Sequence, residues 1–595
     1  MLYIAKRTKE NMPALLMWTG FSVVAKVALP VAEMYLPRVL IDELTGGSAL
    51  SRILTVAATA AVIVALLGGF DKFCERNVYN YKNQMGIFYI REVSLKGIAC
   101  DYANAESEEF RSLQQESFRL CANNESTLRN VYYAWIGFIS GIIGFAVFST
   151  VLATLDAVVL LFLSASAAAG YLINIQVVKW AAENNAERAK YHRKLGYIDD
   201  AADDIKSAKD IRLYKMGPWF QKLYEENIEK IAKWYGRYDR LVIKTSFAGA
   251  SVSLLREGAA YAYLIYLAYA GKIGAGEFIL YFAAITGFSG WLESIFAKLT
   301  EMKTTGMYVG KFRRYLDFPD KFKRAGGVSA RGKPDAPRKI ELTGVSYRYG
   351  GAEGDALRDI NLVIEPGEHL GVVGLNGAGK TTLVKIICGL VDPTDGGAFY
   401  GGVNIKEYNR AEFYGLFSAV FQQHSLLPLS VAEAVAEARP GDIDRGKVKD
   451  SLSAADLWEK VSSLPDGADS LLDKSVNDDA VVFSGGETQK LLLARAVYRD
   501  APVLILDEPT AALDPVAENR LYKRYHELTR GKTSVFISHR LAGTRFCDRV
   551  ILVDNGAIAE TGTHAELLEK GGLYSVLYET QAKYYRENAD TAENS

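Results

Sequence analysis

The sequence predicts a multidomain membrane protein: an all-α domain of six transmembrane helices with long cytosolic helical extensions, followed by an α/β domain. The first observation is the segment 131–178, in which Asp156 is the one charged residue among 48. The second is the alternation of apolar, strand-like segments with helical segments from Ile340 onward, which is typical of an α/β domain. The third is the polar segment KFKRAGGVSARGKPDAPRK, which ends at Lys339 and separates the two regions.

The lengths of the apolar segments set the number of spans. A bilayer core of roughly 30 Å is crossed by about 20 helical residues, so the segment 131–178 must cross twice, with a turn near Asp156. Its unbroken apolar length disfavours the alternative, the buried helices of a soluble protein. The six predicted spans are 13–37, 53–70, 131–154, 157–178, 245–270 and 278–299. We assign 1–320 to the transmembrane domain, 321–339 to a linker, 340–580 to the α/β domain and 581–595 to a polar tail.

The charge pattern predicts orientation and partners. Lys and Arg are frequent in 71–130 and 179–244, absent from 43–51 and limited to Lys272 in 271–277. Because positively charged loops stay in the cytosol, both termini are expected there. The formal net charge of -1 argues against nucleic acid as the main partner, and the five cysteines lack the spacing of a disulfide framework or a zinc site. The lipid bilayer is therefore the first partner that the sequence predicts.

The two long connections are charged and poor in glycine, as in AENNAERAKYHRKLGYIDDAADDIKSAKDIRLYK. This composition favours helix, so spans two to five are expected to continue beyond the membrane as helices. A charge-rich helix is usually only a solvated face. Here two such extensions share the cytosolic side with the α/β domain, which makes them candidate levers.

A glycine-rich loop follows the apolar segment HLGVVG and leads into a helical segment, in the order strand, loop, helix. This order is the context that a phosphate-binding loop requires. The motif GLNGAGKTT supplies the candidate binding residues Gly374, Asn376, Gly377, Ala378, Gly379, Lys380, Thr381 and Thr382. Backbone N–H groups of the loop would cradle phosphates, Lys380 would reach the β- and γ-phosphates, and the Thr381 hydroxyl would bind Mg²⁺. The sequence therefore predicts a P-loop nucleotide-binding domain.

A second apolar segment, APVLILDEPT, ends in two carboxylates. Neighbouring residues at the end of a strand point in different directions. Asp507 suits the surroundings of the metal, and Glu508 suits the polarisation of an attacking water. The buried strand before them makes two solvated loop acids the weaker interpretation.

The stretch FSGGETQK at 483–490 contains no evident catalytic group. With the motifs above, it makes the chain resemble an ATP-binding cassette (ABC) half-transporter of the exporter type, with six spans fused to one nucleotide-binding domain. In that family this stretch is the signature motif, which closes over the γ-phosphate of ATP held by the partner's loop. The resemblance implies that Ser484, Gly485, Gly486 and Glu487 contribute to a partner's site. The N–H groups at a helix start suit that role.

The signature also allows a simpler interpretation, which is compatible with the first. Ser484 followed three residues later by Glu487 is a capping box, which any helix start can use. The family usually has Leu and Gln where this chain has Phe483 and Glu487. Glutamate can still cap the helix, but a carboxylate near phosphate is expected to weaken closure on ATP.

The resemblance implies roles for four further residues. Tyr349 in VSYRYGG would stack on adenine, although a core aromatic is the alternative, and Gln422 in AVFQQHSLL would contact Mg²⁺ and the attacking water. Asp514 would lie in a loop at the dimer interface, and His539 in VFISHRL would contact the γ-phosphate. Gln423, beside Gln422, leaves the choice of glutamine open.

The resemblance implies an ATP hydrolase with ATP and Mg²⁺ as its ligands, which exports a drug, peptide or lipid by alternating access. Its partner would be a second half-transporter, with a homodimer favoured because the chain carries both halves of a site and a heterodimer still possible. The expected location is the plasma membrane, as a multi-pass protein of a bacterium. An importer built on the same fold and an ATP-regulated channel are the alternatives.

Arg256 lies within the predicted fifth span, in SVSLLREGAAYAYLIYLAY. It is about 12 residues from the outer end, or about 18 Å deep in a core of roughly 30 Å. A charge at that depth normally faces a partner or a wet cavity, and the adjacent Glu257 is expected to diverge from it. The spans offer Lys26 and Glu33 as intramembrane partners. The sequence leaves open a structural pair of Arg256 with Glu33 and an Arg256 that faces the cavity and favours anionic cargo.

Overall fold

The computed structural model describes residues 1–204, 207–323, 326–330, 336–422, 426–474, 476–508, 525, 527–539 and 541–593, with side chains up to 583 except at 542. These residues form two compact units. The first joins Met1–Ile98 to Ser112–Phe318, and the second joins Ala99–Arg111 to the chain from Pro319 onward.

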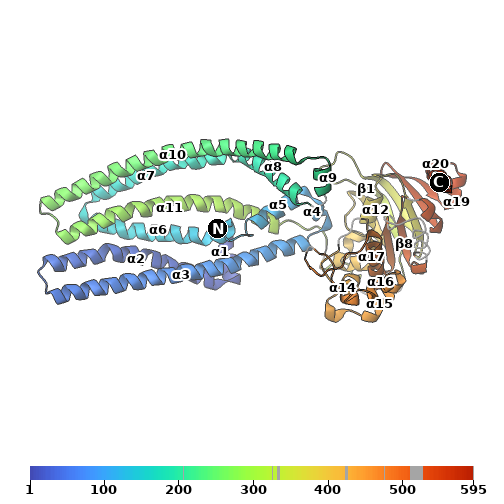
Figure 1. The fold of residues 1–595 in the computed structure, drawn as a ribbon, viewed down its shortest axis with the longest axis horizontal. Helices are drawn as coiled ribbons and strands as arrows, with labels where there is room; N and C mark the ends of the chain where they lie inside the picture. The colour runs from blue at the N-terminus through green and yellow to red at the C-terminus, as the bar shows by residue number, and fades with distance from the viewer. Residues whose placement is uncertain are drawn as a thin grey trace. The chain divides into compact units, whose positions relative to one another are not determined.

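The first unit consists of helices, several of them very long (Figure 1). They are α1 Leu2–Asn11, α2 Pro13–Thr45, α3 Leu50–Ala99, α5 Glu108–Arg119, α6 Thr127–Leu155, α7 Ala157–Glu183, α8 Asn185–Asp203, α9 Ala208–Leu213, α10 Gly217–Tyr269 and α11 Ala275–Leu316. Helices α3, α10 and α11 extend well beyond the apolar segments within them. The helical continuation predicted for spans two to five is therefore present in α3 and α10, which hold the second and fifth spans. Helices α6 and α7, which hold the third and fourth spans, extend only a few residues beyond them, and the long extension of α11, the sixth span, was not predicted.

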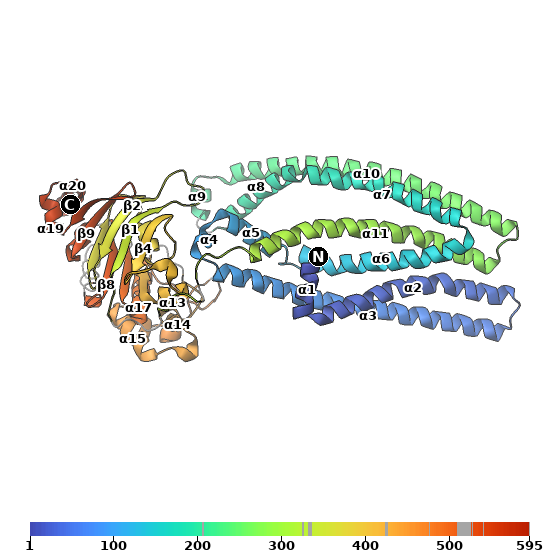
Figure 2. The same cartoon turned by 180° about the vertical axis from the view of Figure 1, so that it is seen from behind.

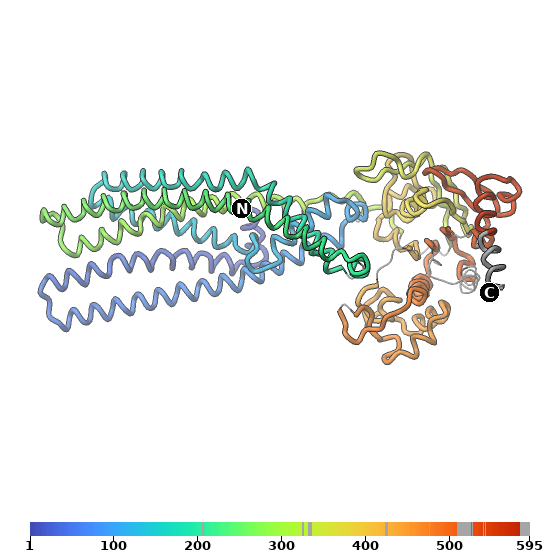
Figure 3. Tube along the Cα trace, turned by 45° about the horizontal axis from the view of Figure 1, so that its top comes forward, coloured from blue at the N-terminus to red at the C-terminus, as the bar shows by residue number. Residues whose placement is uncertain are grey.

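Two helix pairs dominate the packing of this unit. Helix α10 runs beside α7 in Figures 2 and 3, and α11 packs along α6. Small residues allow the second pair to approach closely: a Cβ atom at Gly144 of α6 would lie 2.4 Å from the ring of Trp291 on α11. Around this contact, Phe148, Leu152 and Phe288 are buried in one apolar cluster.

Within the described part of the chain, five helices are long and apolar enough to cross a membrane. They are α2, α3, α6, α7 and α11. Helix α10 covers the predicted span 245–270 but is not among the five, and its apolar half contains Arg256 and Glu257. A sixth span at this place therefore stays a prediction.

The second unit contains two sheets. One has four strands in the order β2-β1-β4-β5 and the other has six in the order β10-β9-β3-β8-β7-β6. The strands are β1 Ile340–Tyr347, β2 Leu357–Ile364, β3 His369–Val373, β4 Asp395–Tyr400, β5 Val403–Asn404, β6 Phe417–Val420, β7 Val503–Asp507, β8 Thr533–Ile537, β9 Arg549–Asp554 and β10 Ala557–Gly562. The helices are α4 Tyr102–Glu106, α12 Lys380–Ile387, α13 Arg410–Phe413, α14 Val431–Ala436, α15 Arg445–Ala454, α16 Trp458–Ser462, α17 Gly485–Arg499, α19 His564–Glu569 and α20 Leu573–Glu593, with short 3-10 turns between them.

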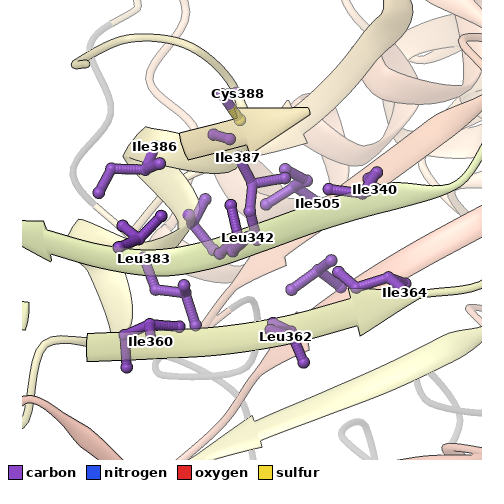
Figure 4. Close-up of a cluster of buried hydrophobic side chains, with 14 of the residues drawn as sticks. Ile340, Leu342, Ile360, Leu362, Ile364, Leu383, Ile386, Ile387, Cys388 and Ile505 are labelled. Carbon is purple, nitrogen blue, oxygen red and sulfur yellow. The ribbon is translucent and has the colours of Figure 1, made fainter. Parts of the chain in front are cut away.

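The core of this unit fixes helix α12. Figure 4 shows apolar side chains of β1 and β2 gathered with those of α12 and with Ile505 of β7. Leu383 and Ile387 of α12 are fully buried there. The helix that follows the glycine-rich loop is therefore held between the two sheets, and its first turn has a fixed position.

The six-stranded sheet brings three strand ends to one edge. Strands β3, β7 and β8 are parallel, with Val372 paired to Ile537 and Asp507 paired to Ile537. The carboxyl ends of parallel strands meet at the same edge of a sheet, where ligands bind in open α/β folds. The loop after β3, the carboxylates after β7 and the histidine after β8 therefore converge.

Candidate functional site

The loop after β3 has the backbone of an anion cradle. Gly374, Gly377 and Gly379 have φ values of 152°, 80° and 106°, which L side chains rarely adopt. A Cβ atom at Gly379 would also lie 2.6 Å from the Ala356 carbonyl oxygen. Only glycine suits this position, and the loop leads directly into α12, whose first N–H groups can bind phosphate.

Lys380 is the first residue of α12 and is buried. Its Nζ donates to the carbonyl oxygens of Gly374 at 3.0 Å and Leu375 at 2.9 Å. Burial lowers the pKa of this ammonium, while the carboxylates of Glu508 and Asp507 oppose the shift. The lysine thus folds back over the loop, beside the space that the loop encloses.

Thr381 and Asp507 form the candidate magnesium site. The Thr381 hydroxyl lies 3.4 Å from Asp507 Oδ2. Asp507 is 1% exposed, and its Oδ1 is buried without a hydrogen-bond partner among the described residues. An orphaned carboxylate oxygen beside a hydroxyl suits a hard cation that takes oxygen ligands. The residues present therefore fit Mg²⁺.

The electrostatics of Asp507 agree with this assignment. Burial, and then the neighbouring Glu508 charge, raise the pKa of Asp507 to about 6. The described residues contain no cluster of three or more His, Cys, Asp or Glu side chains suited to a metal. The candidate site does not need one, because Mg²⁺ keeps waters and takes ligands from the nucleotide's phosphates.

Glu508 is held by two side chains from different strands. Gln422, which follows β6, donates from Nε2 to Glu508 Oε2 at 2.7 Å. His539, which follows β8, contacts the other carboxylate oxygen through Nε2. Burial raises the pKa of Glu508, whereas burial and then the Lys380 charge lower the pKa of His539. Glu508, Gln422 and His539, which lie far apart in the sequence, therefore form one cluster beside Lys380.

The signature stretch begins helix α17 with both hydrogen bonds of a capping box. Ser484 Oγ accepts from the Glu487 N–H at 3.3 Å, and Glu487 Oε2 accepts from the Ser484 N–H at 2.8 Å. The backbone hydrogen bond from Ser484 is the largest cause of the lowered pKa of Glu487, which also lies 3.7 Å from Lys460. The carboxylate is thus directed to its own helix start and to a lysine. Among the described residues, no hydrogen bond or ion pair joins this stretch to the Glu508 cluster.

Tyr349 lies beside α12. Its hydroxyl is 3.1 Å from the Thr382 hydroxyl, and its ring packs edge-on against Tyr347 with centroids 4.9 Å apart. The side chain is only partly buried against the core. Its partial burial therefore fits both interpretations: an aromatic side chain that packs in the core, and a ring with an exposed face that could stack on adenine.

Tyr349 lies next to an ion pair that the sequence did not predict. Lys385 of α12 lies 5.6 Å from the Tyr349 ring centroid and 5.3 Å from that of Tyr102. Its Nζ is 2.7 Å from Glu106 Oε1, and both partners are largely buried. Tyr102 and Glu106 belong to the short helix α4, about 280 residues earlier in the sequence. No local pattern marks so distant a contact.

Two of the expected positions fall outside the described residues: Asp514 and Gln423. The remaining loop residues, Asn376 and Ala378, lie within the glycine-rich loop as the motif requires. Gly485 and Gly486 form the first turn of α17. Their roles stay predictions.

Arg256 lies at a cavity of about 660 Å³ within the first unit. Its Nη2 is 3.1 Å from Glu257 Oε1 and 3.7 Å from Glu293 Oε1. The expectation that Glu257 diverges was wrong, because both long side chains bend toward each other. Glu293 was missed, since its place across from Arg256 depends on how α10 and α11 pack.

The partners considered for Arg256 are engaged differently. Lys26 lies 3.1 Å from Asp71 Oδ2, which joins α2 to α3. No ion pair joins Arg256 to Glu33 among the described residues. The structural pair of Arg256 with Glu33 is therefore not formed.

Known proteins resemble this chain in part of its sequence and in its fold. Residues 357–511 match the family described as ABC transporter. A solved structure titled "Structure of a bacterial Atm1-family ABC exporter with ATP bound" superposes with a TM-score of 0.76 at 19% identity, over 96% of this chain and 99% of that one. The chain has the fold of an ABC exporter. Both units are included in this likeness, because it covers nearly the whole chain.

Curated relatives share the sequence over a shorter range. An ATP-dependent lipid A-core flippase of Burkholderia pseudomallei (strain 1710b) is 39% identical over 254 residues, which are 42% of each chain. A protein of the same name from Bordetella avium (strain 197N) is 32% identical over 368 residues, 60% of this chain and 61% of the relative. The matched segment thus spans from two fifths to three fifths of these relatives.

Proposed function

We propose that this chain is one half of a dimeric exporter that hydrolyses ATP and uses the cycle to move cargo out across a bacterial membrane. The observation that carries the proposal is the convergence of Lys380, Asp507, Glu508 and His539 at one sheet edge behind a glycine cradle. A domain that only bound nucleotide would not need a carboxylate held between an amide and an imidazole. The ABC exporter fold over the whole chain supports transport as the outcome.

Each residue of the candidate site has a separate role in ATP hydrolysis. The loop N–H groups and Lys380 bind and orient the triphosphate. Glu508, positioned by Gln422 and His539, orients the attacking water and accepts its proton as the bond to the γ-phosphorus forms and the bond to the leaving oxygen of ADP breaks. Neutral His539 then contacts the γ-phosphate. Thr381, Gln422 and Asp507 would hold Mg²⁺, which when bound neutralises charge on the β- and γ-phosphates.

The signature residues serve a second copy of the chain. Ser484, Gly485 and Gly486 begin α17 with N–H groups suited to an anion, yet in the part of the chain that the structure describes no hydrogen bond or ion pair links them to the site of their own chain. In a head-to-tail dimer they would complete the partner's site. Because the Ser484 N–H donates to Glu487 Oε2, the N–H groups of Gly485 and Gly486 and the Ser484 hydroxyl are the groups that would reach the partner's phosphate.

The route for cargo lies in the first unit, whose five long apolar helices suit a multi-pass membrane protein. Tyr349 would stack on adenine, and Asp514 would lie at the dimer interface. Both termini would lie in the cytosol. Drugs, peptides and lipids are the cargo classes considered, and the relatives named lipid A-core flippase support lipid among them.

An ATPase measurement on the purified chain tests the proposal. We expect hydrolysis that requires Mg²⁺, is abolished by Lys380→Ala, and is stimulated by at least one member of a panel of drugs, peptides and lipids. The Lys9→Ala variant, on the exposed surface of α1, serves as the matched lysine control and should hydrolyse ATP normally. Hydrolysis that survives Lys380→Ala would contradict the assignment of the site.

A further inference from the structure

The cavity at Arg256 is bounded by one face from each of three helices. Residues three or four apart on a helix share a face, as Ser246, Gly249, Ala250 and Ser253 do on α10. Faces of α7 and α11 supply the rest of the lining. The volume of about 660 Å³ lies within the range of about 300–1,000 Å³ typical of small-molecule sites.

The accessible charge in this cavity is negative. Arg256 is 3% exposed, whereas Glu293 is 60% exposed, and both line the cavity. The arginine also lies within hydrogen-bond distance of Glu257 and Ser253. One cation and two carboxylates leave this group with one uncompensated negative charge. A molecule that enters the cavity therefore meets the Glu293 carboxylate, with Arg256 behind it.

Aromatic and small side chains surround that carboxylate. Tyr171 of α7 and Phe296 of α11 stack with centroids 4.2 Å apart. Phe296 follows Glu293 by three residues, so both side chains are on one face of α11. Gly170 and Gly249 have open space where a Cβ would be, which keeps the cavity wide. Aromatic rings near a carboxylate are the surroundings that bind organic cations in water-poor sites.

We infer that this cavity binds organic cations with apolar or aromatic substituents, with Glu293 as the charge partner. The inference rests on the proposed function, because it names the cargo class of that exporter. It replaces the expectation of anionic cargo at Arg256: that side chain is too buried to serve as the first contact. Arg256 instead lies behind Glu293, with its Nη2 3.7 Å from Glu293 Oε1.

Two ions of equal shape and opposite charge provide the test. Tetraphenylphosphonium and tetraphenylborate binding would be measured by equilibrium dialysis on the full chain in lipid nanodiscs, without nucleotide. The lipid of the nanodiscs itself takes up both ions. The quantity compared is therefore the difference in bound ion between the wild-type chain and each variant. We expect Glu293→Gln to weaken tetraphenylphosphonium binding about tenfold, which corresponds to about 1.4 kcal/mol, and to leave tetraphenylborate binding unchanged or stronger. Glu293→Asp, which keeps the charge, should retain most of the cation affinity.

Glu257→Gln is the matched control. Glu257 contacts the same arginine but does not line the cavity, so its replacement should change cation binding less than about threefold. An unchanged cation affinity in Glu293→Gln, or an equal loss in both variants, would overturn the inference. So would a selective loss of tetraphenylborate. Since binding is measured without ATP, cation binding that depends on Glu293 in a chain that fails to transport would count against the proposed function alone.

Discussion

Glu508 has an unusual backbone for a residue that is not glycine. Its φ is 52°, in the left-handed region, which costs of order 1 kcal/mol or more and recurs at functional sites. The Glu508 N–H donates to the Ile537 carbonyl oxygen at 3.0 Å, and Gln422 and His539 hold its carboxylate. The surroundings thus fix one direction for this side chain, toward the loop that would hold the γ-phosphate.

The first prediction concerns this carboxylate. Glu508→Gln keeps the shape and one acceptor oxygen, but its NH₂ group is a donor and it cannot accept the proton of the attacking water. We expect ATP affinity to be retained and hydrolysis to fall by about 10²–10⁴-fold, measured by nucleotide binding and single-turnover hydrolysis. Near-normal turnover in this variant would show that another group is the base. Glu433→Gln, in the capping box of α14, is the control for loss of a carboxylate elsewhere in the same unit.

A second prediction follows from the raised pKa of Asp507. This pKa lies at about 6, so protons compete with Mg²⁺ below that pH, and the carboxylate is free to bind the metal above it. The Mg²⁺ affinity of the nucleotide-bound chain should therefore fall by about tenfold per pH unit below pH 6 and be flat between pH 7 and 8. Titration of Mg²⁺-dependent ATP binding at several pH values measures this. Phosphate groups protonate in a similar range, so Asp507→Asn supplies the baseline; an identical pH dependence in that variant would contradict the prediction.

At the scale of elements, short-range patterns predicted most of the candidate nucleotide site. The strand, loop and helix around Gly374–Lys380 are contiguous, and Asp507 is the last residue of a fully buried strand that Glu508 directly follows. The contact of Glu508 with Gln422 and His539 could be expected only through the family resemblance, because it depends on the order β3-β8-β7-β6 in the sheet. Sequence patterns report which residues end strands, and sheet order decides which ends meet.

The contact residues that the sequence did not identify were missed for the same reason. Glu106 meets Lys385 through α4, and Glu293 meets Arg256 through the packing of α11 against α10. In both pairs the partners lie on different elements, and no periodicity or spacing within either element marks the contact. The mistaken expectation about Glu257 has a different reason, since it treated neighbouring helical side chains as rigid.

The third prediction separates the capping role of Ser484 from its proposed role at a partner's phosphate. Ser484→Ala removes a cap and should lower the free energy of unfolding by about 1 kcal/mol. Thr563→Ala removes the same kind of capping box from α19 and should destabilise the chain by a similar amount. Only Ser484→Ala should lower the ATPase rate beyond what the loss of stability explains. Equal ATPase rates in the two variants, measured well below their melting temperatures, would show that Ser484 acts only as a helix cap.

At the scale of the whole molecule, the sequence predicted a membrane part and an α/β part, and the described residues form two compact units. It did not predict that Ala99–Arg111 would belong to the second unit. Asp101 explains this grouping in part, because its Oδ2 accepts from the N–H groups of Lys321 and Phe322 at 2.6 and 3.1 Å. Such contacts join segments about 220 residues apart in the sequence and follow from no local signal.

The fourth prediction tests whether two chains share each site in the proposed dimer. Lys380→Ala disables the loop, and Ser484→Arg blocks the signature. Each variant alone should hydrolyse almost no ATP. In a mixed dimer one site carries both changes and the other carries neither, so co-expression of the two at equal amounts should restore up to about a quarter of the normal rate. No recovery in mixed dimers purified through two different tags would contradict completion of each site by the partner chain.

The most direct measurement of the central claim is ATP-driven uptake by sealed vesicles. Inside-out vesicles, in which the proposed orientation would place the ATP-binding units in the medium, would receive Mg-ATP together with radiolabelled tetraphenylphosphonium, a fluorescent lipid or a labelled peptide. The account predicts that at least one of these accumulates against its gradient with the wild-type chain, that Glu508→Gln abolishes the accumulation, and that right-side-out vesicles loaded with ATP lose the same compound. Vigorous ATP hydrolysis without accumulation of any compound, or uptake into ATP-loaded right-side-out vesicles, would contradict export.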